Sequence, residues 1–471
     1  MNVQMDTSFE SWGGFWQPGE NPRIVQGRLL YDPTKGITLD LTEAPSGMPP
    51  LGSEEQAQYS VLFGQLVNGT LVTVTEAFVT QSSFGGGIGC PTKLIASSAL
   101  FGAHVPDLDQ LLVKSYSIRL TSLENWMCAC PVQWKWASDG EKHVGVDMTY
   151  RFPQPIAVSL PKMGFDIEIG HTLTTRPGHS SFDLDGKGYL KVAAHDSLTM
   201  ERAREIAWQC QNLMSLLVGQ RVSVRSVEVT QLPTDTAETA TSSCQILYHQ
   251  IEKAGHDNLQ AALMLIPYAT IKDDFPRMVE QWLDRSEQSV LATNVYFGSL
   301  RHQSPAVNVK FLAIVHAIES YHRSLGVGLY MDQDKFDKAV ERLLSHISPE
   351  IQGDHRLSLK NRLKYGNEHS LRKRLADMLD RIPENARLRI AGDVAKFVQR
   401  VVATRNYYTH YDCSSKEESF SPKEAYTAAE RLRILLVANL IHNLGIKDAD
   451  LMGVLERSQD FQHWLRQPLV S

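Results

Sequence analysis

Residues 390–410 read IAGDVAKFVQRVVATRNYYTH, a stretch that joins an apolar periodicity to a polar end. The apolar residues Phe397, Val398 and Val401 recur at helical spacing, so we predict one amphipathic helix over 390–410. Arg405 and Thr409 are four positions apart and share a face of that helix, and the final residue of the stretch lies beside this face. A guanidinium, an amide and an imidazole gathered at the end of a buried helix favour a chemical role.

The sequence around this stretch, from about residue 272 onward, is also helical in pattern. We expect further helices over 278–300, 307–325, 335–347, 371–382 and 422–445. The last is the best defined, because Ser421 can cap it, Pro422 suits its first turn and Glu424 occupies the capping-box position. Gly445 then ends it. Several amphipathic helices with short links predict an α-helical bundle over 301–471.

The first 300 residues show a pattern typical of β-strands instead of helices. Short alternating or β-branched runs, separated by Gly, Pro, Asn and Asp, predict strands over 24–31, 37–41, 59–66, 71–79, 111–118, 143–152, 156–160 and 222–229. Turns are predicted at Asn68-Gly69 and at 185–188, which read Asp-Gly-Lys-Gly. We expect a helix over 197–218, capped by Asp196 or Ser197 and ended by Gly219.

These patterns predict an α+β multidomain protein, in which a β-rich N-terminal domain is followed by an all-α helical bundle. The predicted parts are an irregular lead-in over 1–23, a β-rich domain over 24–300 with helices near 197–218 and 272–300, and the helical domain over 301–471.

Composition narrows the class of protein. The chain is 42% hydrophobic and 21% charged, and it contains neither a run of about 20 apolar residues nor a secretory leader pattern, so we expect a cytoplasmic protein with no membrane partner. The six cysteines, at 90, 128, 130, 210, 244 and 413, form neither a paired zinc pattern nor a disulfide framework. We therefore expect reduced thiols and no metal.

Charge is divided unevenly along the chain. The net charge of −6 argues at first against a nucleic-acid partner. Residues 301–471, however, contain 26 basic and 21 acidic residues, which leaves 21 basic and 32 acidic residues in the first 300. Such an asymmetry can mark a domain that faces nucleic acid, but chance variation between two domains explains it equally well.

Several stretches of the sequence resemble a known family. The run RNYYTH at 405–410 fits the motif of HEPN ribonucleases, in which an Arg and a polar residue are followed by a His after four to six intervening positions. Residues 311–323, FLAIVHAIESYHR, resemble the first helix of the ApeA-like HEPN branch, and 359–379 resemble its middle. The β-rich part, best over 27–41 and 189–229, resembles the domain that precedes HEPN in ApeA-type bacterial anti-phage proteins.

The resemblance implies a metal-independent endoribonuclease that uses no cofactor and acts by abortive infection. Its catalytic residues would be Arg405, Asn406 and His410. The 2′-OH of RNA would be the nucleophile, with His410 as general base or acid and Arg405 on the phosphate. The products would be a 2′,3′-cyclic phosphate (or 3′-phosphate) and a 5′-OH. Transfer RNA is one candidate substrate, because its single-stranded loops expose the backbone.

The family also implies partners and supporting residues. A homodimer would form a composite active site, and the N-terminal domain would sense a phage-derived trigger that the sequence does not name. Supporting residues would be Glu319, Tyr408 and Thr409, and candidate RNA-binding residues are Lys360, Arg362, Arg372, Lys373 and Arg374.

Structural alternatives remain open for each of these residues. Arg405 could form a plain ion pair with Asp412 or Glu319, and His410 could serve only as a C-terminal helix cap. The tyrosines could pack in the core, and the basic residues could lie on a solvated helix face. A non-catalytic HEPN module that binds nucleotides or proteins is the alternative function, which the intact Arg405 and His410 disfavour.

Overall fold

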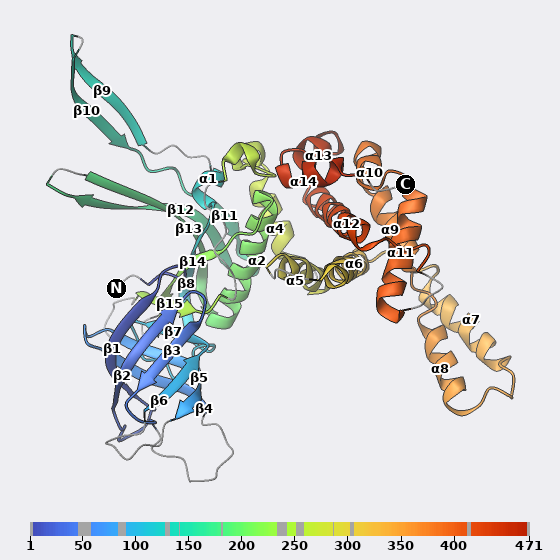
Figure 1. Ribbon diagram of the computed structural model, residues 1–471, viewed down its shortest axis with the longest axis horizontal. Helices are drawn as coiled ribbons and strands as arrows, with labels where there is room; N and C mark the ends of the chain where they lie inside the picture. Colours follow the sequence, from blue (N-terminus) through green and yellow to red (C-terminus); the bar gives the residue numbers. More distant parts are fainter. Residues whose placement is uncertain are drawn as a thin grey trace. The chain divides into compact units, whose positions relative to one another are not determined.

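The computed structural model divides the chain into two compact units, Met1–Leu283 and Asp284–Ser471 (Figure 1). It describes residues 3–45, 58–82, 91–127, 132–140, 142–179, 182–232, 243–250, 259–285, 287–301, 306–411 and 416–468. The predicted boundary at 300/301 was wrong by 17 residues (300 minus 283). The reason is that helix α5 (Glu287–Arg301) packs against helix α6 (Val307–Ser324) and so belongs to the second unit.

The first unit is built on one large antiparallel sheet. Its strands are β1 (Phe9–Trp16), β2 (Val25–Asp32), β3 (Gly36–Leu41), β4 (Gln58–Leu66), β5 (Leu71–Ser82), β6 (Thr92–Ala96), β7 (Ser98–Phe101), β8 (Leu112–Leu120), β11 (Ile156–Leu160), β12 (Phe165–Pro177), β13 (Phe182–Thr199), β14 (Val224–Gln231) and β15 (Ser243–Tyr248). The strand order is β11-β12-β13-β8-β14-β15-β7-β5-β4-β1-β2-β3-β6, and β6 also pairs with β5. That additional pairing closes β5, β4, β1, β2, β3 and β6 into a ring. Strands β9 (Val132–Asp139) and β10 (Lys142–Tyr150) form a separate two-stranded sheet.

Strand β5 changes its neighbour along its length. Its first half pairs with β7 and its second half with β6, and the change falls next to Glu76. Glu76 has a φ of +52°, which few residues other than glycine adopt. This local kink lets one strand belong both to the ring and to the open part of the sheet.

The prediction that 1–23 is irregular was wrong for its centre, because β1 pairs with β2 on one side and β4 on the other. The strand pattern is hidden in the sequence by Gly13 and Gly14. Gly13 is required there: a Cβ at this position would lie 2.5 Å from the carbonyl oxygen of Gln65. The glycine therefore marks a close approach of two strands rather than a break.

The predicted turn at Asn68-Gly69 is confirmed, with Gly69 at a φ of +83° between β4 and β5. The predicted turn at 185–188 was wrong, because β13 runs through it and Gly186 pairs with Leu173 of β12. Both glycines there make room for side chains: a Cβ on Gly186 would meet Tyr150, and one on Gly188 would meet Leu123. The eight predicted strands are all present, each within three residues at either end.

Helix α2 (Met200–Val218) packs against β8 and β13 and buries most of one face. Its N-cap is Thr199, whose hydroxyl accepts from the backbone N–H of Arg202, instead of the predicted Asp196 or Ser197. Gly219, at a φ of +82°, ends it as predicted. The unit is completed by α1 (Leu123–Met127), α3 (Tyr268–Ile271), α4 (Phe275–Leu283) and the 3₁₀ turns at Pro161–Met163 and Ala261–Leu263.

The second unit is a helical bundle. After α5 and α6 it contains α7 (Gln333–Ser345), α8 (Gly353–Lys364), α9 (Leu371–Asp380), α10 (Glu384–Ala391), α11 (Val394–His410), α12 (Pro422–Asn443), α13 (Asp448–Leu455) and α14 (Gln459–Arg466). Helix α12 is its core, since nearly every residue from Ala425 to Ile441 is buried, and it packs against α6, α9, α10, α13 and α14. The predicted capping box of Ser421 and Glu424 is present. None of the described helices combines the length and apolarity that crossing a bilayer requires.

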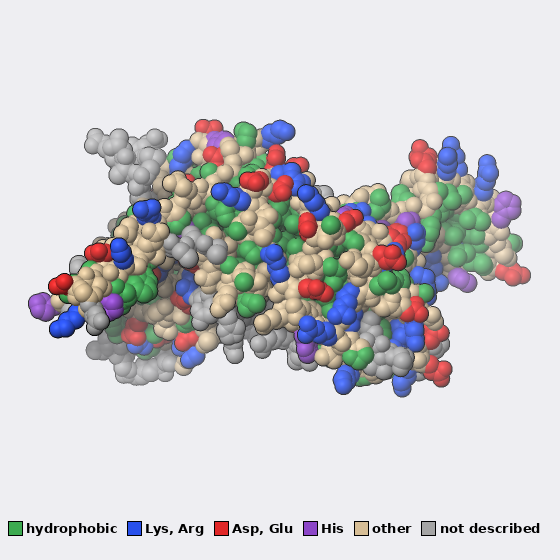
Figure 2. All heavy atoms as spheres, turned by 90° about the horizontal axis from the view of Figure 1, so that it is seen from above, with side chains coloured by type: hydrophobic (Ala, Val, Ile, Leu, Met, Phe, Trp, Pro, Cys, Tyr) green, Lys and Arg blue, Asp and Glu red, His purple; other side chains and the backbone are tan. Residues whose placement is uncertain are grey.

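Two predicted helices are interrupted. The helix expected over 278–300 is α4 and α5, and the helix expected over 390–410 starts only at Val394. Gly392, at a φ of +63°, separates α10 from α11, and the Asp393 side chain then caps α11 by accepting from the N–H of Lys396. Helix α8 lacked an apolar stripe in the sequence, and neither it nor α7 contains a buried residue. Apolar side chains such as Leu343 and Leu357 are accordingly exposed there. Figure 2 shows hydrophobic side chains on the surface at the α7–α8 end of this unit.

Candidate active site at the end of helix α11

Helix α11 has a buried beginning and a solvent-facing end. Phe397, Val398 and Val401 are buried where α11 packs against α6, α9 and α10. Burying each such side chain stabilises the fold by about 2 kcal/mol, which fixes the helix against its neighbours. Residues 405–408 are half-buried, and Thr409 and His410 are exposed. The polar run therefore projects from a firmly held helix into solvent.

Two contacts fix the middle of α11 to the start of α12 and to the residue Phe420 just before it. Thr404 donates to the carbonyl of Arg400 at 2.7 Å and accepts from the N–H of Phe420 at 2.8 Å. Arg400 forms two hydrogen bonds with Glu424, each of 3.0 Å. Partial burial would raise the pKa of Glu424, but the hydrogen bonds from Arg400 and Ser421 outweigh it and lower the pKa to about 2.

Arg405 has no carboxylate partner among the described residues. Its Nη1 donates to Oδ1 of Asn406 at 3.3 Å, so Asn406 contacts the guanidinium. The alternative ion pair with Glu319 is not present, and Asp412 lies outside the described residues. Thr409 donates to the backbone carbonyl of Arg405 at 2.8 Å, which satisfies its hydroxyl within the helix. Within the described residues, the other guanidinium donors of Arg405 have no hydrogen-bond partner.

His410 is the last residue of α11, and its imidazole makes no hydrogen bond within the described parts of the chain. Tyr411 follows it in the left-handed conformation, with a φ of +52°, and its N–H donates to the carbonyl of Tyr407 at 2.8 Å. Five helical positions separate His410 from Arg405, which corresponds to about 140° around the axis and about 7.5 Å along it. The two side chains thus leave the helix in different directions, so the prediction that His410 lies beside the face of Arg405 and Thr409 was wrong.

Tyr408 packs rather than faces solvent. Its ring meets the ring of Phe311 on α6 edge-on, with centroids 5.8 Å apart. Burial raises the pKa of Tyr408, as expected for a hydroxyl that is partly withdrawn from water. Tyr407 lies between Tyr408 and Tyr411, whose side chain is 71% exposed. Of these three rings, only that of Tyr411 is largely exposed to solvent.

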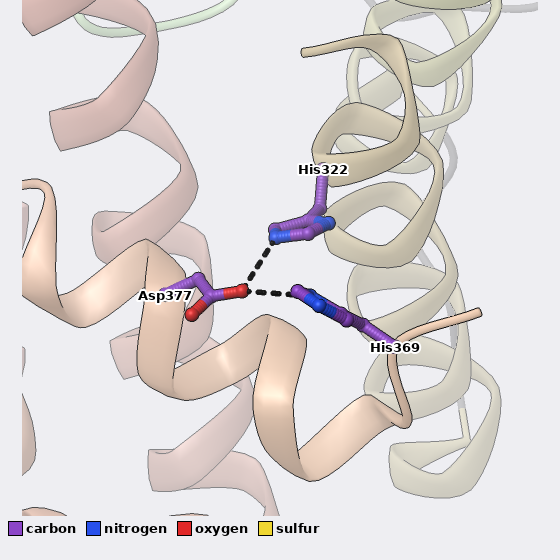
Figure 3. Close-up of side chains that lie close together, drawn as sticks. All are labelled: His322, His369 and Asp377. Carbon is purple, nitrogen blue, oxygen red and sulfur yellow. Dashed lines mark hydrogen bonds and ion pairs between the residues drawn. The ribbon is translucent and has the colours of Figure 1, made fainter. Parts of the chain in front are cut away.

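A second polar cluster joins α6 to α9 (Figure 3). One carboxylate oxygen of Asp377 lies 3.1 Å from Nε2 of His322 and 3.0 Å from Nδ1 of His369. His322 is fully buried, and Nη1 of Arg374 lies 3.2 Å from its Nδ1. Arg374 is buried too, and it also bonds to Glu368 at 2.9 Å.

The three ligand atoms of His322, His369 and Asp377 lie within 4.8 Å of one another, a spacing that could hold a metal ion. The guanidinium argues against that use. Because Arg374 is a donor, Nδ1 of His322 must accept, so the ring proton sits on Nε2 and points at Asp377. A metal on Nε2 would move that proton to Nδ1, directly against another donor. Burial lowers the pKa of His322, which keeps the ring neutral in this network.

This cluster changes the roles predicted for nearby residues. Arg374 is 2% exposed and bonded to protein groups, so it does not belong with the predicted RNA-binding residues. Lys373 pairs with Asp377 at 2.7 Å. Burial lowers the pKa of Arg374, and the nearby carboxylates of Glu368 and Glu319 oppose that shift. Lys360, Arg362 and Arg372 are exposed and have no carboxylate partner in the described structure.

The sequence contained one indication of the buried cluster. His322 lies one turn after Ile318 on the apolar face of α6, where a histidine is expected to be buried.

Comparison with known families agrees with this architecture. The family model described as ApeA N-terminal domain 1 matches residues 11–282, which is 272 of the 471 residues. The chain belongs to the ApeA family. The model described as Apea-like HEPN matches residues 312–450 of this ApeA-type chain, a range that includes all of 405–410. Neither the curated proteins nor the solved structures that were compared gave a match.

For this ApeA-type chain, the predicted family and the predicted fold class are both confirmed. The two matched ranges fall on either side of the boundary between the units, so the family division and the structural division coincide. The assignment supports an HEPN-type anti-phage defence protein.

Proposed function

We propose that this ApeA-type protein is a metal-independent endoribonuclease that stops phage growth by abortive infection. The observation that carries the proposal is the environment of Arg405 and His410. Both lie at the solvent-facing end of α11, neither has a carboxylate partner among the described residues, and both fall inside the HEPN match.

The chemistry requires only these side chains and the RNA itself. A neutral imidazole of His410 removes the proton of a 2′-OH, and the 2′-oxygen forms a bond to the adjacent phosphorus. The bond from phosphorus to the 5′-oxygen breaks, and an imidazolium returns a proton to that oxygen. Arg405 binds the non-bridging oxygens and stabilises the charge that they gain in the transition state. The products are a 2′,3′-cyclic phosphate and a 5′-OH, and no water is consumed in this step.

A composite site between two copies of the chain fits the helix geometry. Arg405 and His410 point about 140° apart around α11. Side chains that diverge in this way cannot both contact the same phosphate from a single helix. A second α11, related by a two-fold axis, supplies an imidazole and a guanidinium from the opposite side. One histidine then acts as base and the other as acid. The active form is therefore a homodimer.

The substrate is RNA in a single-stranded or looped form. Attack by the 2′-oxygen requires it to align opposite the leaving 5′-oxygen, and a regular duplex holds the backbone away from this alignment. Anticodon loops of transfer RNA meet the requirement.

The test is made in bacteria that express the chain and are then challenged with phage. We expect RNA ends bearing 2′,3′-cyclic phosphates, together with fewer plaques, and we expect Arg405→Ala and His410→Ala to lose both. Arg342→Ala and His355→Ala remove the same side chains from exposed positions on α7 and α8 and serve as matched controls. Protection that persists in both α11 variants, or new ends that carry 3′-OH groups, contradicts the proposal.

A further inference from the structure

A basic pocket lies at the opposite end of α11, entirely within the second unit. It has a volume of about 480 Å³. Its lining includes the cationic residues Arg389, Lys396, Arg400, Arg431 and Arg466, and a single carboxylate, Asp393. The apolar part of the lining comes from Leu388, Phe397, Phe420, Leu465 and Pro468. A concave site of this size, with apolar walls and several convergent charges, has the properties of a small-molecule site.

The most buried charge of the pocket is Arg431, which is only 5% exposed. Its guanidinium donates to backbone carbonyls at the end of α10, including Ile390 at 2.9 Å, and near the end of α14, including Leu465 at 3.1 Å. None of its partners in the described structure is a carboxylate. Burial, and then repulsion from Arg389, lowers the pKa of Arg431 to about 10, and the group still remains charged at neutral pH. A full positive charge is therefore held beneath the pocket without an anion to balance it.

Exposed residues at the rim of the pocket add positive charge that no carboxylate in the described structure neutralises. Arg389, Lys396 and Arg466 are exposed and have no carboxylate partner within the described residues. Arg400 differs, because Glu424 neutralises it and its guanidinium stacks on the ring of Phe420 at 4.3 Å.

Asp393 does little to offset these charges. Its carboxylate is engaged as the N-cap of α11, where it accepts from the N–H of Lys396 at 3.0 Å. Four uncompensated cations thus surround one capped carboxylate. Desolvated walls strengthen their field on an anion inside the pocket.

The pocket is separate from the proposed active site. Lys396 precedes Arg405 by nine residues of one continuous helix, which places them about 13 Å apart along the axis. Arg405 and His410 do not line the pocket.

We propose that this pocket binds phosphoryl groups, either those of a free nucleotide or those of an RNA strand that continues beyond the cleavage site. The oxygens of a phosphoryl group accept from the guanidinium donors of Arg389 and Arg466, and the ammonium of Lys396 supplies a further point charge. The apolar walls fit the body of a nucleoside. Binding of a free nucleotide does not depend on RNA cleavage, because the pocket would bind it whether or not the far end of α11 is catalytic. Binding of an RNA strand rests on the proposed function.

The experiment measures two affinities of the full-length chain, one for the fluorescent nucleotide trinitrophenyl-ATP and one for a fluorescein-labelled RNA of twelve nucleotides. The test variant is Arg389→Glu/Lys396→Glu/Arg466→Glu. The matched control, Lys335→Glu/Lys338→Glu/Arg342→Glu, makes the same change of charge on α7. We expect the test variant to bind at least one probe about 10-fold or more weakly, because three attractive contacts become repulsive, while the control changes affinity less than about 2-fold.

Each pattern of results has one meaning. Loss of the nucleotide alone identifies a free nucleotide as the ligand, whereas loss of the RNA, with or without the nucleotide, identifies the strand backbone. Equal affinities in the unaltered chain and the test variant overturn the proposal, as does equal weakening in test and control or no binding of either probe. Lys396→Glu alone, at an exposed position that leaves the fold intact, must show a smaller loss of the same kind. Arg405→Ala must leave nucleotide binding unchanged, which keeps this test independent of the proposed nuclease activity.

Discussion

The second unit contains two pairs of arginine and histidine, and their surroundings are opposite. Arg374 and His322 are buried, they contact each other at 3.2 Å, and both are held by carboxylates. Arg405 and His410 lie at a helix end, do not contact each other and have no carboxylate partner among the described residues. The same two side-chain types thus serve stability where their hydrogen bonds are satisfied, and are available for chemistry where they are not.

The largest expected effect separates the pairs by activity. With purified protein and a single-stranded RNA substrate in a chelator, His410→Ala should lower the cleavage rate by about 10²- to 10⁴-fold, since it removes the proposed general acid or base. Arg405→Ala should cost a similar factor through the lost transition-state contact. Both variants should keep the melting temperature of the unaltered chain. A His410→Ala variant that cleaves at the normal rate would remove the catalytic half of the comparison.

The next effect separates the pairs by stability. Arg374→Ala should destabilise the packing of α6 on α9 by about 3 kcal/mol, because it leaves His322 and Glu368 without their buried partner. The measurement is hydrogen exchange of the amides in α6 and α9 in the full chain. Arg372→Ala, two residues away and exposed, is the control and should change protection by less than about 0.5 kcal/mol. Equal protection in both variants would show that the buried pair is not structural.

A third prediction concerns pH. The folded pKa of His322 lies below its ordinary value of 6.5, so the unfolded state binds a proton that the folded state does not bind. The stability of this region is therefore complete above pH 6.5 and falls as the pH drops below it. Protection of the α6 and α9 amides, corrected for intrinsic exchange, should decrease between pH 7.5 and 5.5. His322→Gln should flatten that decrease, and a decrease of the same size in the variant would assign the effect to another group.

The smallest effect tests the end of α11. Tyr411 adopts a left-handed conformation that glycine adopts without strain, so Tyr411→Gly should stabilise the last turn by about 1 kcal/mol. Slower exchange of the amides near the end of α11 is the expected readout. Tyr411→Ala keeps the strain, removes the same ring and should give no gain. A gain of the same size in Tyr411→Ala would show that the ring, and not the backbone, is responsible.

The sequence predicted the elements that depend on local chemistry. The capping box at Ser421, the hairpin at Asn68-Gly69 and the end of α2 at Gly219 each follow from a residue that acts on its own backbone neighbours. Gly13 and Gly186 led to wrong predictions of irregular structure and of a turn, because each glycine makes room for a distant segment of the chain. Local patterns carry no information on which residue will approach them across the sheet.

The residues of the second unit also fall into a group that the sequence could predict and groups that it could not. Arg405, Asn406 and His410 are adjacent in the sequence, so their grouping could be predicted from one helix. The network around Arg374 unites α6, α9 and the segment before α9, and the pocket around Arg431 unites α10, α11 and α14. Such groupings depend on how the helices pack, and the basic residues involved look like any solvated helix face in the sequence.

The closed ring in the first unit has a practical consequence for shortened versions of the protein. Strand β1 joins β2 to β4 and is the first strand of the chain. A version that starts after Trp16 would open the ring and leave one long edge on each of those two strands. Unpaired edges invite strands from other molecules, so such a version should aggregate even though nearly all of its core residues are retained.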